Sequence, residues 1–258
     1  GEGNADDIAV GSVLEVVLDE DNQAVSVTVR NLNAGGGFGG SGEVTNGTSA
    51  NTITEDTEVD SETYTSTGDD ENALRVDGAT VTLKDITIEK TAGSSSNTED
   101  GDFYGLNAGL LVLNGATATI TGATVNTSVT NGNGVFSYGE GTVVNISDST
   151  IRTTENNSGG IQTTGGGTMN AANLDVETQG NSAAAIRSDR GGGTVKVDGG
   201  SYVTNGTGSP AIYCTADISV SDATLTANAS EGVVVEGKNS VALTDCEVTG
   251  NLSNTYNG

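Results

Sequence analysis

Apolar residues return along this chain at a regular interval of 25 to 26 residues over much of its length. Each interval holds an aliphatic residue, a short turn rich in Gly and Asp, and two stretches in which apolar residues alternate with Thr or Ser. Alternation is the pattern of a half-buried β-strand, and a fixed period of roughly 20 to 50 residues indicates a solenoid. The aliphatic residues that begin the intervals are Leu74, Leu110, Val135, Ile161, Ile186, Ile212 and Val233.

Two further apolar positions follow in each interval and predict two more strands. The first set is Leu83, Ile120, Ile146, Val197, Val220 and Leu243. The second set lies five residues later, at Ile88, Val125, Ile151, Leu225 and Val248, with a six-residue offset to Val203 in one interval. Three short strands per turn indicate an all-β chain, folded as a single-stranded parallel β-helix of about seven coils. The residues that begin the intervals should then stack in one buried column.

The first 61 residues repeat less clearly. Two alternating stretches, Val13–Leu18 and Ala24–Val29, flank an acidic turn and predict a β-hairpin. The glycine-rich tract Asn33–Gly47 reads as a connector. We therefore divide the chain into an N-terminal cap with its connector, residues 1–61, and a β-helix, residues 62–258, with further coils expected to follow. A small separate N-terminal domain is the alternative.

Several intervals together resemble a known class of proteins. Segments such as "DENALRVDGATVTLKDITIEKT", "SAAAIRSDRGGGTVKVDGG" and "SEGVVVEGKNSVALTDCEVTG" resemble right-handed parallel β-helix proteins of the pectate-lyase-like superfamily. More narrowly, they resemble bacterial secreted or cell-surface proteins described as adhesin-like or carbohydrate-binding. The resemblance implies a right-handed coil and an extracellular location. It says less about activity, because this fold hosts lyases, hydrolases, adhesins and phage spikes.

The charge balance narrows the partners. The chain carries 9 basic and 35 acidic residues, for a net charge of −26. Nucleic acid and anionic membranes are disfavoured, because binding them requires neutralisation of phosphate groups by basic residues. No apolar run is long enough to cross a bilayer as a helix, and no signal peptide is recognisable. We expect a monomer without membrane insertion in this segment.

The two cysteines are predicted to be free. Cys214 falls two residues after Ile212 and should face the interior with it, because alternate residues of a strand share one face. Cys246 falls near a corner on a different wall of the coil. A disulfide between them is therefore disfavoured.

The chain contains no histidine, which removes a large part of enzyme chemistry. Ser-His-Asp and Cys-His catalysis and histidine-ligated zinc are excluded. Cleavage of a polysaccharide by a pair of carboxylates, or by a base assisted by Ca²⁺, remains as an alternative. We expect no catalytic residue and no cofactor, apart from Ca²⁺ in an acidic loop.

The candidate ligand site is a row of residues predicted to face outward from the first strand of successive coils. Its members follow one another at steps of about 4.8 Å and would form an exposed ladder of aromatic and hydrogen-bonding side chains, which suits a sugar ring. The alternative is that they stack only because the fold repeats, with Arg187 or Arg190 paired to Asp189. The candidate residues are Phe136, Gln162, Arg187, Asp189, Arg190 and Tyr213.

Two acidic loops are candidates for binding Ca²⁺, which prefers clustered carboxylate and carbonyl oxygens. They lie at Gly68–Asn72 and Thr98–Asp102, and the second belongs to Ala92–Gly105, the longest insertion between intervals. Neither loop has the spacing of an EF-hand, and a solvated loop without metal is the alternative. Function in solenoids often lies on such insertions. The candidate ligands are Asp69, Asp70, Glu71, Asp100 and Asp102.

Together these features predict an extracellular or cell-surface, non-catalytic β-helix module of an adhesin-like protein that binds glycans or another host or cell-surface ligand. A polysaccharide lyase or glycoside hydrolase is one alternative, and a purely structural stalk is another. Ice binding is disfavoured, because Asp217 interrupts the row of strand-opening threonines that it would need.

Overall fold

The computed structural model describes residues 13–18, 24–30 and 44–252, and 52% of the chain is strand against 3% helix. The chain divides into two units, residues 1–43 and 44–258. In the first unit β1 (Val13–Leu18) pairs antiparallel with β2 (Ala24–Arg30), so the predicted hairpin is present. Its role as a cap stays a prediction, and residues 33–43 of the expected connector lie outside the described residues.

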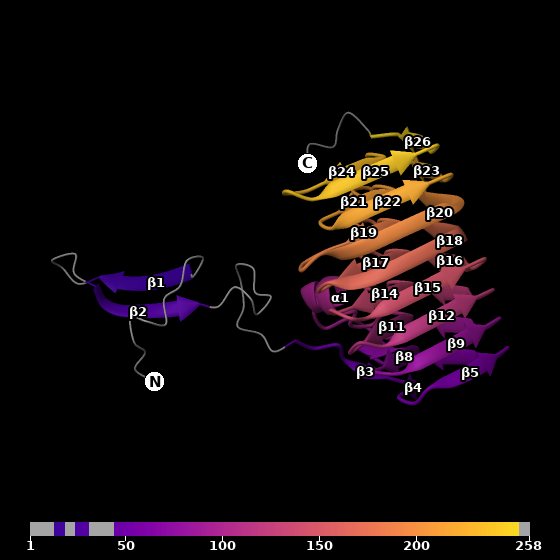
Figure 1. The fold of residues 1–258 in the computed structure, drawn as a ribbon, viewed down its shortest axis with the longest axis horizontal. Helices are drawn as coiled ribbons and strands as arrows, with labels where there is room; N and C mark the ends of the chain where they lie inside the picture. Colours follow the sequence, from indigo (N-terminus) through magenta and orange to yellow (C-terminus); the bar gives the residue numbers. More distant parts are fainter. Residues whose placement is uncertain (1–12, 19–23, 31–43, 253–258) are drawn as a thin grey trace. The chain divides into compact units, whose positions relative to one another are not determined.

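The second unit is a parallel β-solenoid of about eight turns, which confirms the predicted fold class. Its strands stack as three walls (Figure 1), each continued from coil to coil by parallel pairing. The first wall consists of β4 (Thr52–Ile53), β8 (Leu74–Asp77), β11 (Leu110–Leu113), β14 (Val135–Tyr138), β17 (Ile161–Thr164), β19 (Ile186–Ser188), β21 (Ile212–Cys214) and β24 (Val233–Val235).

The other two walls share their longest strands. The second wall consists of β5 (Thr57–Asp60), β9 (Thr80–Lys84), β12 (Thr117–Thr121), β15 (Val143–Ser147), β22 (Asp217–Ser221) and β25 (Ser240–Thr244). The third consists of β6 (Thr63–Ser66), β10 (Thr87–Lys90), β13 (Thr124–Thr127), β16 (Thr150–Thr153), β23 (Thr224–Ala227) and β26 (Glu247–Gly250). Two strands, β18 (Gly167–Thr178) and β20 (Gly193–Thr204), run through the corner and belong to both walls.

The solenoid begins earlier in the chain than the repeats indicate. Short strand β3 (Thr48–Ser49) pairs with β7 (Glu71–Asn72), and β4 and β5 pair with β8 and β9. The expected boundary at residue 62 therefore falls inside the first coil, which is why the coils number about eight rather than seven. The apolar residues of this first coil are too few and too far apart to show the alternation that marks the later coils.

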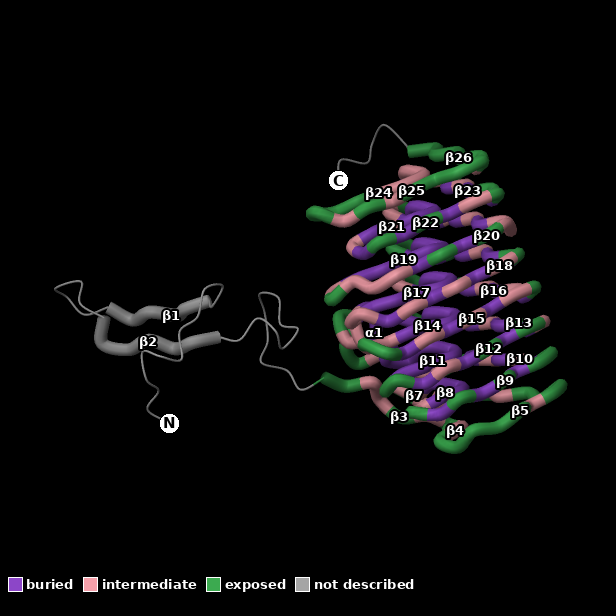
Figure 2. Tube along the Cα trace, viewed as in Figure 1, coloured by how far each residue is buried: buried purple, intermediate pink, exposed green. Residues whose placement is uncertain are grey.

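The predicted core column is confirmed. Ile161, Ile186 and Ile212 lie in direct register and are fully buried. Because each coil covers the apolar face of the next, a thin column of aliphatic side chains is enough to hold the solenoid together. In Figure 2 buried residues recur through the middle coils, whereas β5 and β26 are mostly exposed. Val235, Leu243 and Val248 of the last coil are 41% to 45% exposed, since no described coil lies over them.

One predicted core residue is wrong. Tyr202, rather than Val203, pairs with Val176 and Leu225 and is fully buried. The offset from Val197 is thus five residues here, as in the other coils. Tyrosine carries a polar hydroxyl, so the alternation of apolar residues did not indicate that this position faces inward. Burial raises the pKa of its hydroxyl, which has no hydrogen-bond partner among the described residues.

The corner between the second and third walls explains the recurring Asp, Asn and Gly residues. At this point every later coil has a residue in the left-handed region, where Gly, Asn and Asp are the least strained. The φ angles are 50° at Asp85, 70° at Gly122, 49° at Asp148, 52° at Asn173, 70° at Gly199, 53° at Asp222 and 52° at Asp245. The turn chemistry of the sequence therefore sets the bend of each coil.

The two cysteines are free, as predicted. Cys214 is buried in the core beneath the first wall, and Cys246 is half-buried at the corner after β25. The Sγ of Cys214 lies 3.1 Å from the carbonyl oxygen of Ala216, which accepts its weak hydrogen bond.

Candidate ligand-binding site beneath the α1 insertion

The predicted row on the first wall exists, but it is not exposed. Phe136, Gln162, Arg187 and Tyr213 occupy the same position in successive coils. Phe136 and Gln162 are fully buried and Arg187 is 7% exposed, so only Tyr213 is partly open to solvent. The expectation of an exposed ladder is therefore wrong, because another segment of the chain covers the row.

The covering segment is the long insertion, whose centre is the short helix α1 (Thr98–Tyr104). The helix begins at Asn97, whose Oδ1 accepts a hydrogen bond from the Glu99 amide at 2.9 Å, and ends at Gly105 with a φ of 76°. Gly105 is suited to this end because a left-handed residue closes the helix and a Cβ here would meet the Leu111 side chain at 2.7 Å.

Hydrogen bonds fasten α1 to the first wall. Gln162 donates from Nε2 to the carbonyl oxygen of Asp102 at 2.6 Å, and Thr164 donates from Oγ1 to that of Phe103 at 2.6 Å. The ring of Tyr104 meets the ring of Tyr138 edge to face at 5.7 Å. The last turn of the helix, whose carbonyls would otherwise lack partners, is thus satisfied by side chains of the wall.

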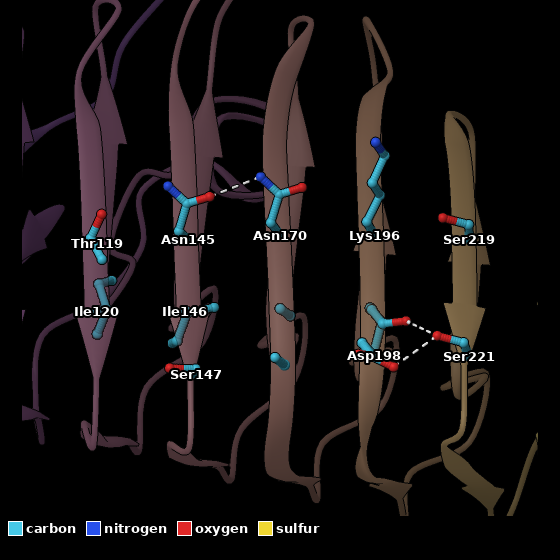
Figure 3. Close-up of a pocket in the computed structure, with 13 residues that line it drawn as sticks. Thr119, Ile120, Asn145, Ile146, Ser147, Asn170, Lys196, Asp198, Ser219 and Ser221 are labelled. Carbon is cyan, nitrogen blue, oxygen red and sulfur yellow. Dashed lines mark hydrogen bonds between the residues drawn. The ribbon is translucent and has the colours of Figure 1, made fainter.

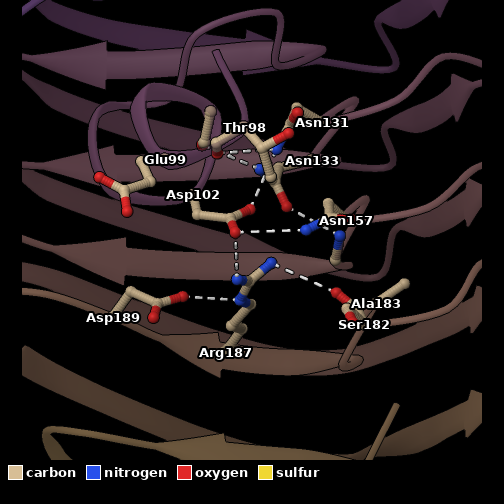
Figure 4. A network of polar contacts seen from close by, with 12 residues as sticks. Thr98, Glu99, Asp102, Asn131, Asn133, Asn157, Ser182, Ala183, Arg187 and Asp189 are labelled. Atoms are coloured by element: carbon tan, nitrogen blue, oxygen red, sulfur yellow. Dashed lines mark hydrogen bonds and ion pairs between the residues drawn. The ribbon is translucent and has the colours of Figure 1, made fainter. Parts of the chain in front are cut away.

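Arg187 lies between two carboxylates at the edge of this covered region (Figure 4). Its Nη2 is 3.0 Å from Oδ2 of Asp102, and its Nε is 2.7 Å from Oδ2 of Asp189. Asn131 and Asn157 donate side-chain hydrogen bonds to Asp102 at 3.0 and 3.3 Å. The network therefore joins α1 to residues from three different coils.

Burial and neighbouring charge shift the pKa values of these groups. Burial alone would lower the pKa of Arg187, but Asp189 and Asp102 outweigh it and raise that pKa. Burial raises the pKa of Asp189 to about 6, with Arg187 opposing the rise and Asp102 adding to it. Burial raises the pKa of Tyr213 as well, and the neighbouring carboxylate of Glu236 acts in the same direction.

A cavity of about 320 Å³ opens beside the network. We call it the α1 pocket, and its lining residues are Asp102, Phe103, Asn157, Ser182, Ala184, Arg187, Asp189, Gly208, Pro210 and Tyr213. Three predicted site residues, Arg187, Asp189 and Tyr213, line it. Phe136 and Gln162 do not, and Arg190 stacks on the ring of Phe103 with its guanidinium carbon 3.9 Å from the ring centre.

Sequence reasoning missed the α1 side of this pocket. Asp102 was assigned to a metal site, whereas it pairs with Arg187, and Phe103 was not assigned at all. The only feature of the sequence that pointed to this segment was its length, since it is the longest insertion between intervals. Length alone does not predict which wall an insertion packs against. Ser182, Gly208 and Pro210 lie in turns that repeat with the coils and carry no distinctive pattern.

The acidic loops are engaged in hydrogen bonds rather than gathered around a common point. Asp69 Oδ1 accepts from the amide and the hydroxyl of Ser94 at 2.7 and 2.8 Å. Asp70 accepts from the amide of Ser96 at 2.7 Å. Glu71 accepts from the hydroxyl of Ser66 at 2.6 Å, and Asp100 lies on α1, where burial raises its pKa.

Within the described part of the chain, no group of three or more Asp, Glu or Cys side chains is placed to hold a metal ion. The predicted Ca²⁺ site therefore has no ligand set in these residues.

A second depression runs along the outside of the second wall (Figure 3). Its volume is about 590 Å³, and we call it the second-wall groove. The side chains of Asn145 and Asn170 are joined by a hydrogen bond of 2.9 Å, and Lys196 continues their row. Asp198 accepts a hydrogen bond from Ser221 at 3.0 Å across the same groove.

Comparison of the chain with models of protein families, with curated proteins and with solved structures gives no match. The solenoid fold is therefore shown by the strand pairing of the structure alone. Among the described residues no helix has the length and apolar character to span a bilayer.

Proposed function

We propose that this chain is a non-catalytic binding module that recognises carbohydrate in the α1 pocket. The observation that carries the proposal is the pocket itself: Tyr213 offers a partly exposed aromatic ring beside the buried, charged side chains of Arg187, Asp189 and Asp102. Sugar rings stack on aromatic faces, and their hydroxyls take hydrogen bonds from fixed polar groups. A cavity near 320 Å³ lies at the small end of the range of about 300 to 1,000 Å³ for ligand pockets.

Buried charge at the pocket favours binding over a purely structural stalk. Burying an ion costs several kcal/mol unless it is paired and hydrogen-bonded, so a buried ion pair contributes little to stability alone. Here Arg187 is held by two carboxylates whose side chains are 13% and 11% exposed. Shifted pKa values in a cavity are a common mark of functional sites.

A polysaccharide hydrolase or lyase is the second candidate, and one observation favours it. Asp189 has a pKa of about 6 and lies beside a second carboxyl, Asp102, with which it shares Arg187. Paired carboxyls in different protonation states perform acid and base catalysis in glycosidases. We favour binding because both carboxylates already bond to Arg187.

We further propose a secreted or cell-surface, adhesin-like context. The resemblance to β-helix surface proteins supports it, as does the abundance of Thr, Ser and Asn on the outer faces of the walls. The net charge of −26 keeps such a strand-rich molecule from associating edge to edge.

A glycan array tests the proposal, with detection of unsaturated uronate and of new reducing ends as the assays for cleavage. We expect binding without cleavage, and loss of binding in Tyr213→Ala. Asn170→Ala is the matched control, because it removes a polar side chain from the second-wall groove. Loss of glycan binding in Asn170→Ala instead would place the site in the second-wall groove. Absence of any bound glycan would favour the structural stalk. Cleavage that is abolished by Asp189→Asn would establish the enzyme.

A further inference from the structure

The α1 pocket is short of positive charge. Of the residues that line it, Asp102 and Asp189 are acidic and Arg187 alone is basic, which gives a formal charge of −2 + 1 = −1. Glu236, which helps to raise the pKa of Tyr213, adds a further carboxylate nearby. Because the pocket is partly shielded from water, charges here act more strongly on a ligand than they would at the open surface.

The one lining cation is already held by two carboxylates and a carbonyl oxygen. Arg187 uses Nε for Asp189, Nη2 for Asp102 and Nη1 for the carbonyl oxygen of Ser182, at 2.7, 3.0 and 3.4 Å. An anionic sugar such as a uronate would have to share Arg187 with the two carboxylates that already neutralise it, and they would repel it. Arg190 is outside the lining and stacks on Phe103. The pocket therefore disfavours acidic glycans.

One side-chain oxygen in the α1 pocket, Oδ1 of Asp189, has no hydrogen-bond donor among the described residues. Asp189 is 8% exposed and lines the pocket, and both of its side-chain contacts use Oδ2. Its Oδ1 receives no hydrogen bond from any described residue (Figure 4). A carboxylate oxygen that lines a pocket and has no protein donor can accept a hydrogen bond from a ligand.

We propose that the α1 pocket binds the primary ammonium group of an amino sugar that is not N-acetylated, with Asp189 Oδ1 as its principal acceptor. This rests on the proposed carbohydrate-binding function and names the ligand class. An ammonium group has three donors and no acceptor, which complements a negatively charged pocket in which Asp189 Oδ1 is free to accept a hydrogen bond. The Tyr213 ring covers the apolar face of the same sugar.

Alternative occupants fit the pocket less well. A divalent metal ion lacks a ligand set, because no three acidic or thiol side chains gather in residues 44–252. A neutral sugar would leave the excess negative charge of the lining uncompensated. An N-acetylated sugar replaces the ammonium group with an amide, which has one donor and no charge.

Calorimetric titration at physiological ionic strength separates these classes. The probes are a chitosan tetramer, its fully N-acetylated counterpart, a galacturonate tetramer and a tetralysine peptide. We expect the chitosan tetramer to bind about tenfold or more tightly than the acetylated one, since charge-assisted hydrogen bonds exceed neutral ones by roughly that factor. This comparison changes only the ligand, so it does not depend on the folding of a variant.

Variants then test which carboxylate of the protein binds the ammonium group. Asp189→Asn should weaken binding of the chitosan tetramer about tenfold, whereas Asp198→Asn, which removes the same charge from the second-wall groove, should leave it unchanged. Affinity should also fall as the pH drops below about 6, where Asp189 takes up a proton in the presence of Arg187, Asp102 and Glu236. Circular dichroism of each variant confirms that it is folded.

Each other result contradicts the proposal in a distinguishable way. Equal weakening by Asp198→Asn would mean diffuse attraction to an acidic protein, and equal binding of tetralysine would mean that no sugar is recognised. Tighter binding of the acetylated or galacturonate probe, lost in Tyr213→Ala, would overturn the amino-sugar inference but preserve carbohydrate binding. Binding of no glycan at all would remove both.

Discussion

At the scale of single residues, the unusual feature is Arg187, a cation buried in the wall of a solenoid. Removing one partner of a buried charge network leaves the others unpaired, which destabilises a fold far more than the network stabilises it. Asp102 and Asp189 would both be left without their cation if Arg187 were lost.

We therefore expect Arg187→Ala to lower the free energy of unfolding by about 3 to 5 kcal/mol. The control is Arg152→Ala on the third wall, where Arg152 contacts Asp175 and Glu177 near the surface and the cost should be about 0 to 1 kcal/mol. Urea denaturation of both variants measures the difference. Equal losses would show that the Arg187 network is no more than a surface ion pair.

The pH dependence of stability should report on Asp189. Its pKa in the folded protein, about 6, is above its ordinary value of 3.8, so the folded state holds the proton more tightly than the unfolded state. This group thus stabilises the fold at low pH and loses that contribution as the pH rises from about 4 to about 6.

The measurement is the free energy of unfolding of the wild type minus that of Asp189→Asn across this range. We expect the difference to decrease with rising pH and to level off above about 6, because the asparagine does not titrate. A difference that is flat with pH, or that increases, would contradict the raised pKa.

At the scale of elements, each coil contributes one residue to each column, and its stability comes from the coils on either side. Ile186 lies between Ile161 and Ile212 and is fully buried. Val233 occupies the same column in the last coil, where it is only half-buried.

Ile186→Ala should cost about 2 to 4 kcal/mol, because it leaves a cavity that two fixed neighbours cannot fill. Val233→Ala should cost less than half as much, since water already reaches that position. Thermal and urea unfolding of the two variants give the comparison. A small effect at Ile186 would mean that neighbouring coils move in to close the gap.

At the scale of the whole molecule, a solenoid has contacts between neighbouring coils and few over longer distances. In the last described coil, Leu243 and Val248 therefore stand in core register yet are each 41% exposed. The α1 insertion is the exception, because it ties residues of several coils together through Asp102, Gln162 and Thr164.

Deleting residues 230–258 should leave the remaining coils folded. The slope of unfolding free energy against urea concentration is proportional to the surface exposed on unfolding. We expect this slope to fall by about one-eighth, since one of about eight turns is lost. Circular dichroism and urea titration check both points. Complete unfolding of the shortened chain would show that the last coil is needed by the whole solenoid.

The amino-acid sequence by itself determined the architecture of this protein. Period, alternation and turn residues are local properties that repeat, so a strand, a corner and an inward position could each be assigned many times over. The column through Ile161, Ile186 and Ile212, the interior place of Cys214 and the register of Phe136 with Gln162 and Arg187 all followed from this repetition.

Only the tertiary structure decided what surrounds those positions. An insertion interrupts the repeat, and nothing in its composition specifies the wall on which it lies. The structure places α1 over the row that should have been exposed, pairs Asp102 with Arg187 and leaves a pocket at their edge. Burial, ion pairing and pKa depend on neighbours distant in the sequence, so the chemistry of the site could be determined only after the chain had folded.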